Sequence, residues 1–173
     1  MKELQGKVAL VTGASRGIGA AIAQELAAEG CHVALAARSG DAIERLAARL
    51  AQERGVQAIA LPVDLSEEAQ AAGLVQRTVA ALGRIDILVN NAGAGLYGDV
   101  ASLDSADLRA AFDLNLFAAI ATMRAAVPHM RAQGDGVIVN IGSIVGKFTQ
   151  PLGGGYSATQ YALHGASGGA RDE

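Results

Sequence analysis

Short apolar runs alternate with longer amphipathic segments along the whole chain. Five runs are apolar at all or nearly all of their positions, which is typical of strands that are buried on both faces of a parallel sheet. These runs cover residues 8–11, 33–37, 58–61, 85–89 and 137–141. Because a segment long enough for a helix separates most runs from the next, the pattern predicts strands and helices in alternation.

The intervening segments carry helix periodicity and helix boundaries. They cover residues 20–26, 41–54, 66–82 and 104–130, and a last helix is predicted from about Tyr156. Within 41–54, apolar side chains recur at the i, i+3, i+4, i+7 spacing of one helix face, and Asp41 with Glu44 predicts a capping box. Glycines that could end the first three helices stand at Gly30, Gly55 and Gly83.

This alternation indicates one fold class. Parallel strands need crossover connections, and right-handed crossovers place helices on both faces of the sheet. We therefore expect an α/β fold of the doubly wound, Rossmann-like type, with residues 1–173 forming a single domain. The glycine-rich stretch 165–169 would weaken the last helix, because each interior glycine costs about 1 kcal/mol relative to alanine.

The composition of the 173 residues narrows the function classes. Hydrophobic residues make up 51% of the chain, which supplies a sizeable core. The formal net charge is −3 and no basic run is present, which argues against a nucleic-acid partner. The apolar stretches are short and interrupted by charged residues, so we expect no membrane-spanning helix. The first residues carry no secretory signal pattern.

Cysteine and histidine positions argue against a disulfide framework and a metal site. Cys31 is the single cysteine, and we interpret it as a small buried side chain in a reducing compartment, the cytoplasm. His32, His129 and His164 are scattered, without the spacing of metal ligands. We therefore expect a cytoplasmic protein that holds no metal ion.

A glycine-rich turn follows the first apolar run and leads directly into the first helix. It reads Thr12-Gly13-Ala14-Ser15-Arg16-Gly17-Ile18-Gly19. Glycines let the backbone approach a pyrophosphate closely, and the helix N-terminus supplies free N–H groups and a partial positive charge. The spacing differs from the common G-x-G-x-x-G fingerprint, and glycine turns between a strand and a helix also serve packing. Taken alone, the turn leaves dinucleotide binding and simple packing both open.

Further motifs follow in order, and together with the turn they resemble the short-chain dehydrogenase/reductase family over the whole chain. The turn 12–19 is similar to the TGxxxGIG of that family, and Asn90-Asn91-Ala92-Gly93 is similar to its NNAG. Asp64 stands where the family has an acid beside the adenine, and Asn115, Ser143 and Tyr156 follow in the order and spacing of its active site. The resemblance implies a nicotinamide cofactor held by Gly13, Ser15, Arg16, Gly17, Ile18, Gly19, Arg38, Ser39, Asp64, Asn91, Ala92 and Gly93.

By this resemblance, the reaction is hydride transfer between the nicotinamide and a carbonyl or alcohol. Tyr156 would exchange a proton with the substrate oxygen, Ser143 would hydrogen-bond that oxygen, and Asn115 would hold a relay water from a kinked helix. The family's Tyr-x-x-x-Lys departs here, because position 160 is Gln160. A phenol's ordinary pKa of about 10 must be lowered for this proton transfer, and Gln160 brings no charge that would do so. We expect activity to be lowered by roughly 10²–10⁴-fold.

The end of the second apolar run bears on the choice of cofactor. A carboxylate there would bind the adenosine ribose hydroxyls and repel a 2′-phosphate. The chain instead has Ala37-Arg38-Ser39, and Arg38 could form a fork with the phosphate, together with Arg16. We therefore expect a preference for NADP(H), with NAD(H) possible. The alternative is that Arg38 is a solvated surface charge.

Two interpretations of the function stay open. The first is an oxidoreductase that acts on a small-molecule carbonyl or alcohol. The second is a nucleotide-binding remnant, a pseudoenzyme or a fragment, with little or no turnover. The common family form is longer, so the resemblance implies that its last strands are missing here or that the sequence is partial. The strand at 137–141 would then be an exposed apolar edge, and we expect a homo-oligomer or aggregation through that edge.

Overall fold

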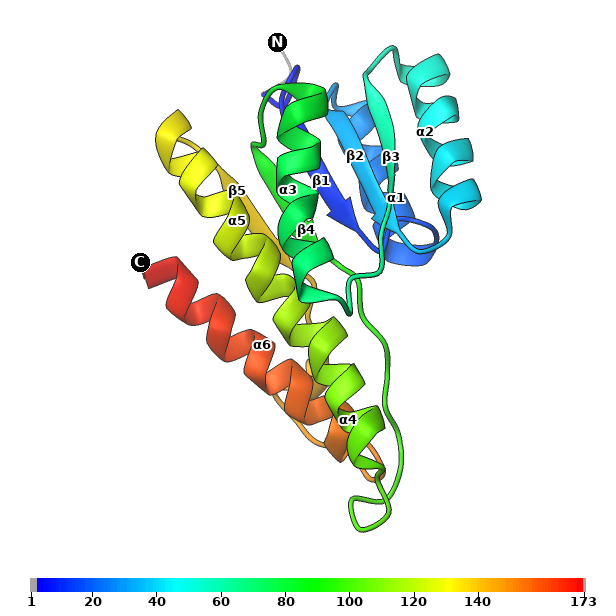
Figure 1. Cartoon of the computed structure of the whole chain (residues 1–173), viewed down its shortest axis with the longest axis vertical. Helices are drawn as coiled ribbons and strands as arrows, with labels where there is room; N and C mark the ends of the chain where they lie inside the picture. Colours follow the sequence, from blue (N-terminus) through cyan, green and yellow to red (C-terminus); the bar gives the residue numbers. More distant parts are fainter. Residues whose placement is uncertain (1–2, 173) are drawn as a thin grey trace.

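A five-stranded parallel sheet lies at the centre of the computed structural model, which describes residues 3–172 (Figure 1). The strands are β1 (Val8–Thr12), β2 (His32–Ala37), β3 (Ala58–Pro62), β4 (Ile87–Asn90) and β5 (Val137–Asn140). Their order in the sheet is β3-β2-β1-β4-β5, and every neighbouring pair is parallel. The strand order changes direction between β1 and β4, and such a switch point opens a crevice at the carboxyl ends of the strands.

Helices cover both faces of the sheet and confirm the predicted doubly wound, Rossmann-like fold. They are α1 (Gly17–Ala28), α2 (Gly40–Arg54), α3 (Glu68–Leu82), α4 (Ser105–Phe112), α5 (Ala118–Gln133) and α6 (Gly154–Asp172). A π-helical segment, η1 (Asp113–Phe117), joins α4 to α5, and a 3-10 turn, η2 (Ile144–Gly146), follows β5. In Figure 1, α3, α5 and α6 lie on one face, and α1 lies on the other.

The core consists of two apolar layers, one on each face of the sheet. Ala9 and Val11 of β1 belong to the layer under α1 and α2, whereas Leu10 belongs to the layer under α3 and α5. Successive side chains of a strand point to opposite faces, so a strand that is apolar at every position contributes to both layers. All five residues of β1 are buried. This two-sided burial is the reason that runs of consecutive apolar residues identify the central strands.

The start of α2 differs from the sequence-based prediction. The helix begins at Gly40, and the side chain of its N-cap residue, Ser39, makes no capping hydrogen bond. The predicted capping box of Asp41 and Glu44 is therefore wrong, because Asp41 already lies inside the first turn. At the other end, Gly55 takes the left-handed conformation (φ 67°) and ends the helix as predicted.

The third helix begins two residues later than predicted. Ser66 was expected at its start, but α3 begins at Glu68, with Glu67 as its N-cap residue. The Oγ and the N–H of Ser66 both donate to Asp64 Oδ1, at 2.7 and 3.0 Å. Aspartate and serine side chains compete with helical hydrogen bonding in this way, and the closed turn holds Ser66 outside the helix.

The glycine-rich end of the last helix remains helical. α6 continues through the stretch 165–169 to Asp172. Leu163, on the middle turns of α6, packs against Leu116 of η1 and Ala119 of α5. Most helical stability in proteins comes from the packing of an apolar face, so this contact offsets the low helix propensity of the glycines.

β5 lies at one edge of the sheet, and no other described strand pairs with its outer side. Val137 and Val139 are 52% and 39% exposed. The expectation that this strand is buried on both faces is therefore wrong. The exposed apolar edge expected from the sequence is present in the structure.

One described segment, Ser105–Gln133, is long and apolar enough to cross a membrane by length and composition alone. The sequence was expected to hold only short, interrupted apolar stretches, and this segment is an exception. It comprises α4, η1 and α5. Ala121, Ala126 and Met130 of α5 are buried in the apolar layer shared with α3 and the sheet. In this fold the segment is a core element of the domain.

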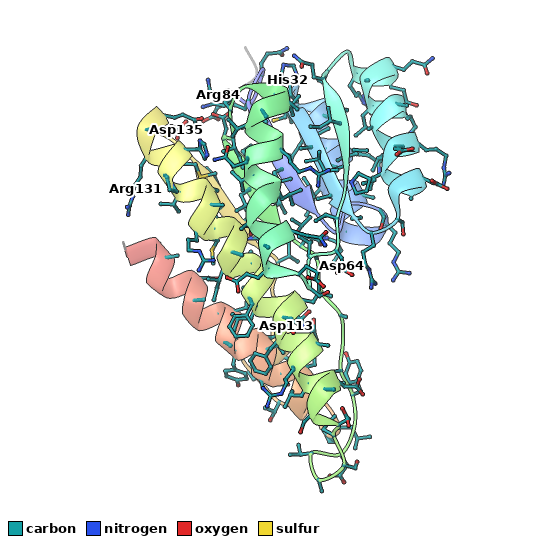
Figure 2. The ribbon with its side chains drawn as sticks, viewed as in Figure 1. His32, Asp64, Arg84, Asp113, Arg131 and Asp135 are labelled. Atoms are coloured by element: carbon teal, nitrogen blue, oxygen red, sulfur yellow. The ribbon has the colours of Figure 1, made fainter. Side chains whose placement is uncertain are left out.

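A buried carboxylate connects the amino ends of β1 and β4. Asp86 is 2% exposed, and its Oδ2 accepts hydrogen bonds from the N–H of Val8 and from Arg84 Nε, both at 2.8 Å. Burial would raise the pKa of Asp86, but the Arg84 and Val8 hydrogen bonds outweigh it and hold the pKa below its ordinary value of 3.8. Figure 2 shows Arg84 and Asp135 at this end of the sheet, far from Asp64 at the opposite end.

We expect Asp86→Asn to lower stability in a pH-dependent manner. The carboxyl pKa is lower in the folded chain than in the unfolded chain, so Asp86 stabilises the fold above the unfolded pKa. This contribution is lost as the pH falls through the folded pKa. Asp86→Asn should lose about 1–3 kcal/mol of unfolding free energy at about pH 7. The deficit should shrink at about pH 3, as urea unfolding at both pH values would measure. An equal deficit at both pH values would contradict the role of the charge.

Candidate active site

The glycine-rich turn between β1 and α1 lies directly against the loop that follows β4. A Cβ atom on Gly13 would stand 2.8 Å from Asn91 Nδ2 and 2.9 Å from Ala92 Cα. A Cβ atom on Gly19 would overlap both Asn91 Nδ2 and the carbonyl of Gly13. Gly13 also has a φ of +65°, which favours glycine. The two glycines therefore allow a close approach of backbone segments at the crevice between β1 and β4.

Hydrogen bonds from Asn91 and Thr12 hold this approach in place. Asn91 Nδ2 donates to the carbonyls of Thr12 and Gly13, at 2.9 and 3.3 Å. The Thr12 hydroxyl accepts the N–H groups of Asn91 and Ala92, at 2.9 and 3.1 Å, and donates to the carbonyl of Val89 at 3.3 Å. The glycine-rich turn in the sequence does not reveal that the Thr12 hydroxyl makes these bonds, because Asn91 and Ala92 lie about 80 positions away in the chain.

Helix α1 presents its N-terminus at the end of this turn. Arg16 is the N-cap residue, its side chain makes no capping hydrogen bond, and the first turn as described holds no acidic residue. Arg16 and Ile18 are exposed, and Ser15 is half-buried. A helix end of this kind binds anions through its free N–H groups and its partial positive charge.

Arg38, Ser39 and Asp64 lie at the same edge of the sheet, at the carboxyl ends of β2 and β3. Arg38 and Ser39 are exposed, and Asp64 is half-buried. Hydrogen bonds from the hydroxyl and the N–H of Ser66 lower the pKa of Asp64, and the positive charge of Arg38 lowers it further. The guanidinium of Arg38 is therefore within electrostatic reach of Asp64.

Asn115 lies in the π-helical segment η1 and is only 3% exposed. Its Oδ1 accepts the N–H of Ala94 at 2.8 Å, and its Nδ2 donates to the carbonyl of Ala94 at 2.9 Å. π-Helical turns often occur at functional sites, and here the turn directs an amide side chain at the loop after β4. The helix irregularity implied by the family resemblance is present.

Ser143 and Tyr156 lie on two segments that follow β5. Ser143 is the residue before η2, and its Oγ accepts the N–H of Val145 at 3.4 Å. Tyr156 lies in the first turn of α6, where its N–H donates to the carbonyl of Leu96 at 3.3 Å. The rings of Tyr156 and Tyr97 lie 6.0 Å apart between centroids, at a tilt of 53°. Packing and hydrogen bonding thus hold Tyr156 against the loop that Asn115 also binds.

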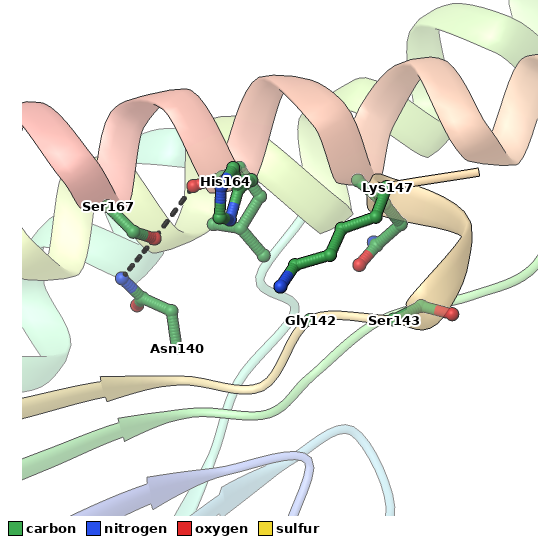
Figure 3. A pocket seen from close by; sticks show the side chains of 9 residues that line it. Asn140, Gly142, Ser143, Lys147, His164 and Ser167 are labelled. Carbon is green, nitrogen blue, oxygen red and sulfur yellow. Dashed lines mark hydrogen bonds between the residues drawn. The ribbon is translucent and has the colours of Figure 1, made fainter.

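Gln160 lies one helical turn after Tyr156 and faces a cavity of about 140 Å³ between α6 and the segment after β5. The side chain is 5% exposed, and its Oε1 has no hydrogen-bond partner among the described residues. Ser143 lines the same cavity, whereas Tyr156 is not part of its lining. In Figure 3, the side chain of Lys147 extends into this cavity. A Cβ on Gly146 would stand 2.9 Å from the Gln160 carbonyl, so glycine permits the close packing of η2 against α6.

The residues present fit a dinucleotide at the crevice in two respects. The backbone around Gly13 and Gly19 has no room for side chains, and it leads into an uncapped helix N-terminus that suits a pyrophosphate. The buried, unpaired Oε1 of Gln160 can accept a hydrogen bond from a ligand hydroxyl. The predicted positions therefore gather at the carboxyl edge of the sheet, where open α/β sheets bind ligands.

Comparison with known proteins identifies relatives along the whole chain. A sequence model of the short chain dehydrogenase family matches residues 7–173. An uncharacterized oxidoreductase of Methylorubrum extorquens is 39% identical over 168 residues, which cover 97% of this chain and 67% of the relative. A solved metagenomic short-chain oxidoreductase in complex with NADP has a TM-score of 0.91 and 39% identity, over 96% of this chain and 76% of its own.

A second solved structure widens the range of bound cofactors. It is a xylitol dehydrogenase bound to NAD+, with a TM-score of 0.88 and 34% identity, over 94% of this chain and 62% of its own. The chain spans 67%, 52% and 56% of the length of three of the curated relatives it matches. The shared region contains the glycine-rich turn, the loop after β4 and the first turns of α6.

Proposed function

The chain belongs to the short-chain dehydrogenase family, and from this premise we propose that it binds NADP(H) in preference to NAD(H) and transfers a hydride between that cofactor and a small carbonyl or alcohol. The observation that supports this most is the glycine cradle of Gly13 and Gly19, braced by Asn91 at the crevice between β1 and β4. Solved neighbours in complex with NADP and NAD+ support a nicotinamide cofactor. The preference between the two rests on Arg38.

In this proposal two side chains, Ser143 and Tyr156, act on the substrate oxygen. The bound nicotinamide supplies or accepts the hydride. Ser143 donates a hydrogen bond to the oxygen, and Tyr156 gives that oxygen a proton during reduction or takes it during oxidation. The Asn115 amide is already engaged with Ala94, so a relay water near Asn115 would bind its main chain. Gln160 would hold a cofactor hydroxyl through its unpaired Oε1.

Gln160 also supports a second function, which is nucleotide binding with little or no turnover. An amide carries no net charge, so Gln160 cannot favour the ionised form of a nearby phenol as an ammonium group would. We propose that this substitution slows hydride transfer without preventing cofactor binding. Turnover with a panel of ketones distinguishes the two functions, because a remnant would bind NADPH and consume none.

Arg38→Asp is expected to reverse the cofactor preference. A guanidinium binds a 2′-phosphate with paired hydrogen bonds, whereas a carboxylate repels the phosphate and binds ribose hydroxyls. We expect the parent chain to bind NADPH more tightly than NADH, and the ratio of the two affinities to fall by roughly 100-fold in Arg38→Asp. Titration that follows nicotinamide fluorescence measures both affinities, and the absence of tryptophan removes one background signal.

Arg49→Asp provides a matched control for the change in charge. Arg49 is exposed on α2, away from the carboxyl edge of the sheet, and it undergoes the same reversal of charge. Its affinity ratio should equal that of the parent chain. If Arg38→Asp and Arg49→Asp had equal ratios of NADPH affinity to NADH affinity, Arg38 would be a solvated surface charge with no role in cofactor choice. No binding of either cofactor would refute the proposed function itself.

We also propose a cytoplasmic location and self-association. Cys31 is fully buried, burial raises the pKa of its thiol, and its Sγ donates to the carbonyl of Leu4 at 3.4 Å, which suits a permanently reduced cysteine. Exposed apolar side chains on β5 and on the segment before α5, among them Val137 and Phe117, favour association. Light scattering at micromolar concentration tests this, and a clean monomer would count against it.

A further inference from the structure

A single hydroxyl connects Asn115 to the helix that carries Tyr156. Thr159 lies on α6 and is fully buried. Its Oγ1 donates to the carbonyl of Tyr156 at 2.8 Å and accepts a hydrogen bond from Asn115 Nδ2 at 3.0 Å. Thr159 occupies an unspecified position of the Tyr-x-x-x-Lys pattern, and the sequence assigns it no role. It lies between two proposed site residues that are 41 positions apart in the chain.

The hydrogens that Asn115 Nδ2 and the Thr159 hydroxyl can donate are all used. An asparagine amide nitrogen has two hydrogens, and Asn115 Nδ2 gives one to the carbonyl of Ala94 and the other to Thr159 Oγ1. A threonine hydroxyl has one hydrogen, which goes to the carbonyl of Tyr156. Removal of the Thr159 oxygen would therefore leave a buried N–H of Asn115 without an acceptor, and buried donors are costly to leave unpaired.

The same hydroxyl completes a closed circuit around the loop after β4. Asn115 binds both the N–H and the carbonyl of Ala94, and the N–H of Tyr156 binds the carbonyl of Leu96. Thr159 joins the two ends, because it binds Asn115 and the carbonyl of Tyr156. Three segments, η1, the loop after β4 and the first turn of α6, are thus held in one relative position by main-chain and buried side-chain bonds.

We propose that Thr159 is a positioning residue that sets the place of Tyr156 relative to Asn115 and to the loop after β4. This inference rests on the proposed function, in which Tyr156 handles the proton of the substrate oxygen. Thr159 touches neither substrate nor cofactor in this scheme. It acts through the first turn of α6, and a small displacement of a proton donor has a large effect on rate even when binding is unchanged.

The test compares Thr159→Val with Thr159→Ser and with a matched control. Valine keeps the shape of threonine and lacks the hydroxyl, whereas serine keeps the hydroxyl. Thr78→Val removes an equally buried hydroxyl from α3. Among the described residues, the Oγ1 of Thr78 binds only the carbonyl of Leu74 in its own helix, at 3.0 Å. Both valine variants lose one buried hydroxyl within a helix, and only the one at Thr159 loses a bond between segments.

In ketone reduction, we expect Thr159→Val to lower kcat by roughly 10- to 100-fold with little change in KM for NADPH. Thr159→Ser should restore kcat to near the parent value, and Thr78→Val should leave it within about threefold. If Thr159 had only a structural role, Thr159→Val would lower the free energy of unfolding, and it would not lower kcat while leaving KM unchanged. Equal kcat values for the two valine variants would overturn the proposal. If the parent chain turns over too slowly, the same three changes are compared in chains that carry Gln160→Lys.

A second readout separates this inference from the proposed function. Hydrogen exchange measured by NMR reports the Asn115 side-chain amide and the Tyr156 N–H in the chain without cofactor. Thr159→Val should accelerate both by roughly tenfold relative to Thr78→Val, and Thr159→Ser should restore protection. Faster exchange with no turnover in any chain would refute the proposed function and retain the coupling by Thr159. Unchanged exchange in Thr159→Val would overturn the coupling itself.

Discussion

Gln160→Lys is expected to raise the rate of ketone reduction by roughly 10²–10⁴-fold, the usual contribution of acid–base catalysis. Gln160 lies one helical turn after Tyr156 and is 5% exposed, so water would screen an ammonium group there only weakly. A unit charge at about 4.5 Å, in an effective dielectric of about 20, stabilises a phenolate by roughly 3–4 kcal/mol. Consumption of NADPH with a panel of ketones, followed over a range of pH, measures the gain.

Gln160→Met is the matched control for this gain. Methionine has a similar length but brings neither charge nor a polar atom, and it removes the buried, unpaired Oε1 of Gln160. We expect the methionine variant to show no gain in rate over the parent chain and to be at least as stable. Equal rates in the lysine and methionine variants would show that charge at position 160 does not limit the reaction. A parent chain that reduces ketones as fast as the lysine variant would also show that charge at position 160 does not limit the reaction.

Gly19→Ala is expected to weaken NADPH binding by roughly 100-fold, or about 2.7 kcal/mol. The added Cβ would overlap Asn91 Nδ2 and the carbonyl of Gly13, so the turn or the loop after β4 has to move. Neither can move freely, because Asn91 Nδ2 is held by the carbonyls of Thr12 and Gly13. The same displacement changes the backbone that would face the pyrophosphate. Fluorescence titration with NADPH measures the loss of affinity.

Gly73→Ala separates this local effect from glycine replacement in general. Gly73 lies inside α3, and a Cβ there would meet no atom within 4 Å. Alanine favours the helix by about 1 kcal/mol over glycine, so this variant should be more stable and should bind NADPH as the parent does. If Gly19→Ala and Gly73→Ala bound NADPH equally well, the turn would serve packing alone.

The order of strands and helices could be predicted because two-sided burial leaves a local signature. Leu10 and Val11 are neighbours in β1 and belong to opposite apolar layers, so an unbroken apolar run is what a covered parallel strand requires. The same pattern wrongly predicted that β5 is buried on both faces, because Val137 and Val139 are exposed. A residue's type does not record whether a neighbouring segment covers it, and β5 lies at an edge.

Helix boundaries were predicted less well because caps depend on competing local bonds. The pair Asp41 and Glu44 has the spacing of a capping box, yet α2 begins earlier, at Gly40. Ser66 has the side chain of an N-cap residue, but its hydroxyl binds Asp64 and the helix starts at Glu68. The residue at which each helix begins depends on competing hydrogen bonds of similar strength, about 1 kcal/mol each. The spacing of residue types in the sequence does not show which of these bonds forms.

By itself, the sequence determined the doubly wound fold, the glycine-rich turn and the order of the candidate site positions, because these depend on local patterns of burial and on motif spacing. The tertiary structure decided how those positions are held. Thr12 and Asn91 are 79 positions apart, and Asn115 and Thr159 are 44 positions apart. The bonds of Asn115 to Ala94, the unpaired Oε1 of Gln160 and the hydrogen bond between Asn115 and Thr159 all arise where such distant segments meet. A hydrogen bond needs both partners at about 3 Å, and only the folded chain brings them there.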